Sequence, residues 1–180
     1  TSYSKGVMLP YRSLWSNTTF AFEVLPLKAG DKLVCMLPMA HMYGLAFEFL
    51  YEFSVGCHIY YLTRMPSPKI IFQAFADVKP NLIVAVPLII EKIIKKSVLP
   101  KLETPTMKLL LKVPIINDKI KATVREQMIQ AFGGNFAAVI VGGAAFNQEV
   151  EQFLRMIDFP YTVGYGMTEC GPIICYEDWT

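Results

Sequence analysis

Hydrophobic and polar positions along this chain predict short buried strands separated by amphipathic helices. Apolar residues at helical spacing predict helices over residues 11–24, 43–53, 68–78, 88–96, 118–132 and 147–157. Short apolar runs predict strands over residues 31–36, 57–62, 82–86, 137–141 and 160–163. Because strands and helices alternate, we predict the α/β fold class: a layered, mostly parallel sheet with helices on both faces.

Capping and turn residues support these boundaries. Ser67 can cap a helix that has Pro68 in its first turn, and Gly133 and Gly134 end the helix predicted over 118–132. Residues 100–114 contain three prolines and three lysines, which predicts a connector with some helix.

The composition narrows the class of protein. The 180 residues are 53% hydrophobic and suffice for one domain with a sizeable core. The mean hydropathy of +0.37 fits strands buried on both faces or a segment of a longer protein. The net charge of +2 indicates no nucleic-acid partner, and the longest apolar run, 82–90, is too short for a membrane span. The first residues lack Met and an apolar signal core, so we expect the sequence to begin inside a longer chain.

The four cysteines favour a cytoplasmic protein with reduced thiols. Cys35, Cys57, Cys170 and Cys175 form no Cys-x-x-Cys pair, which argues against a zinc site or a disulfide framework. Cys170 lies beside a glycine-rich stretch, where it is either a small packing residue or a reactive thiol.

The most informative stretch is the glycine-rich segment 164–172, which follows the last predicted strand. It contains Gly164, Tyr165, Gly166, Met167, Thr168 and Glu169. Glycines allow the backbone to approach a ligand closely, a Thr hydroxyl and backbone N–H groups can hold phosphate oxygens, and a Glu carboxylate can hold Mg²⁺. Tyr165 offers a flat face to a base. The alternative is a glycine-rich turn that closes a βα unit, with Glu169 solvated.

Three further segments carry candidate chemistry, each with a structural alternative. Thr1, Ser2 and Lys5 suit a phosphate loop or an exposed polar terminus. His41, in the pattern Leu-Pro-x-x-His-x-x-Gly, suits a polar residue beside a carboxylate in an apolar pocket, or a histidine with local packing. The small residues Gly142, Gly143 and Ala144 suit a flat ligand against the backbone, or close helix–strand packing. His58 has no partner at metal spacing and is expected to be structural, whereas the aromatic stretch 47–61 suits core packing or the wall of an acyl channel.

Together, in this order, these four motifs resemble the adenylate-forming superfamily of acyl-CoA synthetases, peptide-synthetase adenylation domains and luciferases. The segment 164–169 carries the most specific match, and the resemblance covers the whole chain. The segments 159–172 and 5–9 look most like bacterial long-chain fatty acid–CoA ligases. The resemblance implies that residues 1–180 are part of the large N-terminal AMP-binding domain, without the C-terminal domain, so that this fragment alone is expected to be inactive.

The resemblance also implies roles and cofactors. The parent enzyme would use ATP, Mg²⁺ and coenzyme A to convert a fatty acid to an acyl-adenylate and then to a thioester. Glu169 would hold Mg²⁺, Thr168 and nearby backbone N–H groups the α-phosphate, and His41 would lie by the reacting carboxylate. The nucleotide would be bound by residues from three motifs: Thr1, Ser2, Lys5, Gly142, Gly143, Ala144, Gly164, Tyr165, Gly166, Met167 and Thr168.

This sequence departs from the family pattern at two places. The family's later elements, namely the Asp that binds ribose, the hinge and the C-terminal domain with its catalytic Lys, are not in residues 1–180. The other departure is in the phosphate loop. About four small residues that the family's phosphate loop has between Ser2 and Tyr3 are absent, and their true deletion would remove the β/γ-phosphate grip. Such a deletion would favour a non-catalytic relative that binds nucleotide or acyl-AMP. Another acid as substrate and a carrier protein as acceptor also stay open. The oligomeric state also stays open, and a long-chain substrate is compatible with peripheral membrane contact.

Overall fold

The computed structural model describes residues 6–102, 104 and 114–176. Two groups of strands form its centre. β1 (Lys32–Cys35) pairs in parallel with β2 (His58–Tyr61). Within the described residues, a second sheet has the order β3-β4-β5-β6 and consists of β3 (Ile83–Ala85), β4 (Val139–Val141), β5 (Tyr161–Gly166) and β6 (Ile173–Tyr176). Neighbouring strands are parallel except for β5 and β6, so the predicted α/β class is confirmed.

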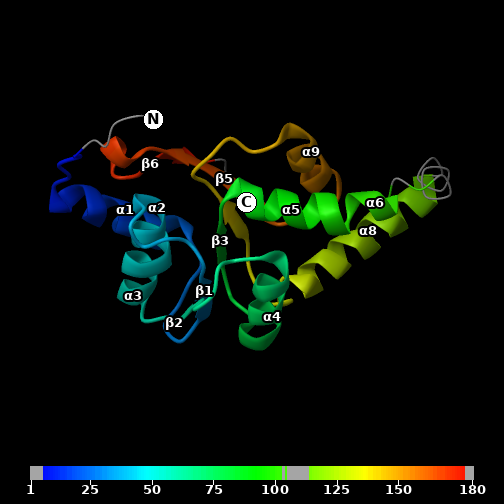
Figure 1. The fold of residues 1–180 in the computed structure, drawn as a ribbon, viewed down its shortest axis with the longest axis horizontal. Helices are drawn as coiled ribbons and strands as arrows, with labels where there is room; N and C mark the ends of the chain where they lie inside the picture. The colour runs from blue at the N-terminus through cyan, green and yellow to red at the C-terminus, as the bar shows by residue number, and fades with distance from the viewer. Residues whose placement is uncertain (1–5, 103, 105–113, 177–180) are drawn as a thin grey trace.

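Helices flank these strands. They are α1 (Tyr11–Val24), α4 (Pro68–Val78), α5 (Pro87–Ser97), α6 (Leu99–Leu102), α8 (Pro114–Ala131) and α9 (Gln148–Met156). Of these, α1 and α4 have the predicted bounds. The Ser67 hydroxyl accepts a hydrogen bond from the backbone N–H of Ile70 at 3.4 Å, which confirms the predicted cap of α4. Figure 1 shows α1 at one end of the molecule and α6 and α8 at the other, with β1, β3 and β5 between them and β6 near α1.

The helical stretch predicted over 43–53 is one continuous helix with an irregular middle. It consists of α2 (Met42–Leu45), a π-helical segment η1 (Ala46–Leu50) and α3 (Tyr51–Val55). Gly56, with a φ of 87°, ends it in the left-handed conformation that glycine adopts most readily. None of the helices among the described residues is both long and apolar enough to cross a bilayer.

Two predicted boundaries were wrong, whereas the helix expected within the connector 100–114 is present in its described part. We expected α8 to begin at Asp118, but it begins at Pro114, because proline is tolerated in the first turn of a helix. Of the predicted connector 100–114, the described part belongs to α6 and α8 apart from Thr104, and the remainder lies outside the described residues. β5 continues through Gly166 instead of breaking after Val163, because β6 pairs with it and satisfies its backbone groups.

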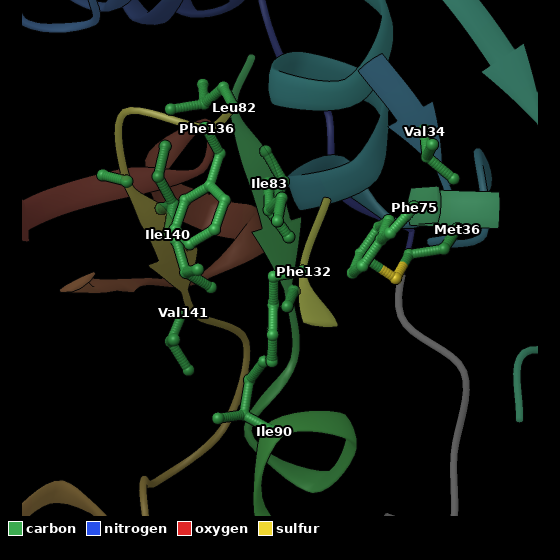
Figure 2. Packing of buried hydrophobic residues seen from close by; sticks show 14 of the residues in the cluster. Val34, Met36, Phe75, Leu82, Ile83, Ile90, Phe132, Phe136, Ile140 and Val141 are labelled. Carbon is green, nitrogen blue, oxygen red and sulfur yellow. The ribbon is translucent and has the colours of Figure 1, made fainter. Parts of the chain in front are cut away.

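The aromatic part of the core lies at the amino ends of β4 and β5. The ring of Phe132 from α8 lies 5.8 Å from Phe75, 6.0 Å from Phe136 and 5.7 Å from Phe159, measured between centroids. Figure 2 shows Phe75 beside Met36, which follows β1. The carboxyl ends of the strands are therefore the ends left for a ligand, as is usual in parallel α/β sheets.

Candidate active site

A cavity of about 190 Å³ lies where β4, β5 and β6 meet α1 and the start of α2. Eight of the predicted site residues line it: His41, Gly142, Gly143, Gly164, Tyr165, Gly166, Met167 and Thr168. These residues come from three motifs, with His41 lying about a hundred positions before the other two, and the fold brings them together at one cavity. Ala144 and Glu169 are exposed and do not line the cavity. Thr1, Ser2 and Lys5 lie outside the described residues.

The backbone directly after β4 carries no side chains, because Gly142 and Gly143 follow the strand. The backbone N–H of Gly142 donates to the carbonyl of Ala85 at 3.1 Å, which carries the sheet one residue past β4. A Cβ at Gly142 would lie 3.1 Å from Cζ of Tyr43 and 3.3 Å from the carbonyl oxygen of Gly164. Gly143 then turns with a φ of 87°, a conformation that strains residues with a side chain. Any larger residue at Gly142 would press on both Tyr43 and β5.

Tyr43, which the sequence reasoning did not place in the site, forms the floor of the cavity. Its hydroxyl can donate a hydrogen bond to two carbonyl oxygens, that of Ile140 at 3.2 Å and that of Ala85 at 3.4 Å. Burial, and then the charge on Glu48, raise the pKa of this phenol, so it stays protonated and remains a donor. The only sequence signal was its position two residues after His41 on a predicted helix.

The segment 164–172 forms a tight hairpin between β5 and β6. The backbone N–H of Met167 donates to the carbonyl of Pro172 at 2.9 Å, and that of Gly171 donates to Thr168 at 3.1 Å. A Cβ at Gly166 would overlap the carbonyl oxygen of Pro172, so only glycine fits there. The tip of the hairpin is the short helix η2 (Thr168–Cys170). The glycines therefore serve close backbone packing, and the same packing presents the hairpin tip to solvent.

Polar groups at this tip are free to meet a ligand. Tyr165 is 59% exposed and also lines the cavity. Within the described residues, the side chains of Thr168 and Glu169 form no hydrogen bond or ion pair with the protein. An aromatic face, a hydroxyl and a carboxylate thus stand within five positions of each other on one rigid hairpin.

Another part of the cavity lining is largely apolar and comes from α1 with its C-cap, η1, β4 and β6. The lining residues there are Phe20, Val24, Leu25, Phe47, Ile140, Ile173 and Tyr176. The Phe20 ring meets Tyr176 edge-on at 5.3 Å, and Tyr43 lies 5.9 Å from Phe47. The backbone N–H of Ile173 donates to Oδ1 of Asn17 at 3.0 Å, which ties α1 to β6. Of the aromatic stretch predicted to be core or channel wall, Phe47 does line the cavity.

A divalent cation would find one protein ligand here. The described residues contain no group of three or more His, Cys, Asp or Glu side chains that could hold a metal ion. Mg²⁺ is commonly bound by one or two carboxylates together with substrate phosphates, and the exposed carboxylate of Glu169, next to the lining residue Thr168, fits that mode.

Fold and site together define an α/β structure with a cavity at the carboxyl ends of its strands. The model of one family, described as AMP-binding enzyme, matches residues 1–180. The chain therefore belongs to the AMP-binding enzyme family, and the resemblance to adenylate-forming enzymes is confirmed. The bacterial branch stays a prediction.

Curated relatives and solved structures agree with this family. The chain is 26% identical over 152 residues to long-chain-fatty-acid–CoA ligase 4 of Saccharomyces cerevisiae, covering 77% of this chain and 22% of the relative. It is 30% identical over 183 residues to 4-coumarate:CoA ligase 1 of Petunia hybrida, covering 97% and 28%. The crystal structure of ATP-bound MatB from Rhodopseudomonas palustris has a TM-score of 0.68 at 18% identity, covering 99% of this chain and 29% of that one. The chain thus spans less than a third of the length of these proteins.

Proposed function

We propose that the enzyme containing this chain activates a long-chain fatty acid with ATP and transfers it to coenzyme A. A carboxylate oxygen attacks the α-phosphorus, the bond to the β-phosphate breaks, and pyrophosphate leaves. The thiol sulfur of coenzyme A then attacks the acyl carbonyl, loses its proton to solvent, and displaces AMP. The observation that supports this proposal is one cavity with a polar glycine- and tyrosine-rich mouth and an apolar wall.

The polar mouth suits the nucleotide. Tyr165 would stack on the adenine, with Gly142 and Gly143 along its other side because neither carries a side chain that would hold the base away. Ala144 lies one residue further out and exposed, so its contact would be with the outer edge of the base. The Thr168 hydroxyl, which has no protein partner among the described residues, would bind the α-phosphate.

Charge neutralisation is the main requirement of the first step, because two anions must meet. Bound Mg²⁺ would offset phosphate charge, and Glu169 would hold it from the hairpin tip. His41 lines the cavity, where it would orient the fatty carboxylate. Thr1, Ser2 and Lys5 remain the proposed β/γ-phosphate loop.

The apolar wall of the cavity and the relatives both indicate which acid the enzyme activates. The wall formed by α1, Phe47 and Ile173 offers no charged partner to the acyl group, which suits an unsubstituted hydrocarbon chain. The relatives named above include both a long-chain fatty acid ligase and a coumarate ligase, so an aryl acid is the second candidate. The aromatic rings of Phe20, Tyr43 and Phe47 around the cavity favour that alternative.

The test is ATP–pyrophosphate exchange by the full-length enzyme with acids from acetate to palmitate, benzoate, coumarate and amino acids. Exchange driven by palmitate is the expected result. Exchange driven by coumarate or another acid would keep the adenylation chemistry and overturn the substrate. No exchange with any acid would favour a non-catalytic relative. Coenzyme A and a carrier protein, offered in turn to the active enzyme, would then distinguish the two acceptors.

A further inference from the structure

The loop that carries His41 is packed so closely that it has little freedom of its own. The backbone N–H of His41 donates to the carbonyl of Pro38 at 3.0 Å, and the His41 carbonyl accepts from Leu45 at 2.9 Å. A Cβ at Gly44 would lie 2.8 Å from the Pro38 carbonyl oxygen. The position of His41 at the cavity therefore follows the position of the backbone at Leu37 and Pro38.

A buried carboxylate holds that backbone. Oε2 of Glu48 accepts a hydrogen bond from the backbone N–H of Leu37 at 2.7 Å, and Oε1 accepts from Met36 at 3.2 Å. The thiol of Cys35 donates to Oε2 at 3.3 Å. Glu48 is 1% exposed, so solvent cannot replace these donors. An ionised carboxylate only accepts, and it can take all three hydrogen bonds at once.

Glu48 reaches the loop because of the irregular helix in which it lies. It is the central residue of η1, where the α-helical spacing is interrupted. Such π-helical turns are found frequently at functional sites. Its neighbour Phe47 lines the cavity, whereas Glu48 faces the end of β1. One turn of the helix thus contacts the site directly and also holds the loop that enters it.

A second buried acid, Glu52, does not hold backbone N–H groups as Glu48 does, within the described residues. It is 1% exposed, and its Oε2 has no hydrogen-bond partner among the described residues. Burial, and then the charge on Glu48, raise the pKa of Glu52 to about 9, so it is neutral at pH 7. Burial also raises the pKa of Glu48, to about 7, against the lowering effect of the N–H groups of Leu37 and Met36. Around pH 8 the charge in this pocket therefore resides on Glu48.

Among the residues that the structure describes, no cation acts on Glu48 to balance its charge. The titratable groups that face it are Cys35 on β1, Tyr43 on α2, Tyr61 on β2 and Glu52 on α3. Within the described part of the chain, no ion pair includes Glu48 or Glu52. A buried, unbalanced carboxylate opposes folding stability, so its presence calls for another explanation.

We propose that Glu48 is a positioning residue: its carboxylate fixes the backbone of Met36 and Leu37 and, through it, sets where His41 lies in the candidate active site. The inference rests on the proposed function for its kinetic consequence. It adds a residue that does not touch substrate and that none of the sequence motifs contains.

The test uses Glu48→Gln in the full-length enzyme. The glutamine keeps the size of the side chain but turns an NH₂ group toward a backbone N–H donor, which displaces the loop. Because small misplacements of reacting groups have large kinetic effects, kcat for exchange should fall about 10- to 100-fold at pH 8. The KM for ATP should change little. The acid limb of kcat near pH 7 in the wild type should be absent from the variant.

Two controls separate positioning from a general structural role. Glu48→Gln removes a buried charge but leaves one backbone N–H without an acceptor, and these two effects on the Tm at pH 8 oppose each other. The variant should therefore stay folded at the assay temperature while kcat falls, whereas loss of a purely structural residue would lower the folded fraction and the activity together. Glu52→Gln replaces an acid that is already neutral, and it should keep wild-type kcat. In a double-mutant cycle, Glu48→Gln should add nothing to the loss caused by His41→Ala, and additive losses would overturn the proposal.

An activity-independent readout keeps this inference distinct from the proposed function. If the wild type exchanges pyrophosphate with no acid, the proposed function fails. The imidazole NMR signal of His41, identified by its loss in His41→Ala, then decides the inference. A shifted or broadened signal in Glu48→Gln supports the positioning role, and an unchanged signal overturns it.

Discussion

Replacing Gly142 with alanine tests whether Tyr43 and the strand end are packed as tightly as the structure shows. The added Cβ would lie 3.1 Å from Cζ of Tyr43, 3.3 Å from its hydroxyl oxygen and 3.3 Å from the carbonyl oxygen of Gly164. These distances are shorter than ordinary van der Waals contact. The Tyr43 ring cannot simply move away, because its hydroxyl is held by the carbonyls of Ile140 and Ala85.

The expected loss of folding free energy follows from the close contact that the added Cβ makes with Tyr43 and Gly164. Overpacking a well-filled site typically destabilises a protein by about 1–3 kcal/mol. The backbone of Gly142 is not in the left-handed region, so the loss comes from the contact and not from backbone strain. Displacing the Tyr43 ring, which lines the cavity, would also change the cavity's shape and raise the KM for ATP.

The assay compares thermal unfolding and the KM for ATP in two backgrounds of the full-length enzyme. In the wild-type background, Gly142→Ala should lower the Tm and raise the KM. In a Tyr43→Ala background most of the obstruction is gone, so the same substitution should have a smaller effect by about 1 kcal/mol or more, the range seen for residues in contact. Equal effects in both backgrounds would refute the reasoning.

Three further predictions concern the hairpin tip and the buried acids. Glu169→Ala should reduce adenylation by roughly two to three orders of magnitude, the scale for losing one electrostatic group, and near-normal turnover would remove Glu169 from the mechanism. Tyr165→Ala should weaken ATP binding, measured by calorimetry, while the circular dichroism spectrum stays unchanged, because the ring is 59% exposed; unaltered affinity would exclude stacking. The pKa of Glu52 is raised from 4.5 to about 9, so the folded state binds the extra proton and loses stability as pH rises through that window. Glu52→Gln should flatten this decline in denaturant-unfolding free energy between pH 5 and 9, and an unchanged slope would contradict the assignment.

The sequence predicted the regular elements well where local chemistry decides them. α1 has the predicted bounds, and α4 begins at its Ser67 cap, because periodicity and capping are local properties. β6 was missed because its four residues pair only through a hairpin whose glycines read as a loop. The glycines of β5 were taken for a break, although partner packing, seen in the contact between Gly166 and Pro172, keeps them in the strand.

The site was predictable only in its motifs. The glycine-rich segment and His41 carry local signals, and both reach the cavity. The apolar wall carries no local sequence signal, because Phe20 and Tyr176 lie far apart in sequence and meet only in the fold. The burial of Glu48 was likewise hidden: an acid on a predicted helix is usually solvated, and only the π-helical turn directs it toward β1.

The most direct test of the adenylation chemistry is to follow a heavy oxygen isotope through one turnover of the full-length enzyme. Palmitate labelled in its carboxylate is supplied with ATP, Mg²⁺ and coenzyme A, and the AMP released is analysed by mass spectrometry. Attack of the carboxylate on the α-phosphorus predicts one labelled oxygen in AMP. Thioester formation with unlabelled AMP would contradict the acyl-adenylate and, with it, the role proposed for this cavity.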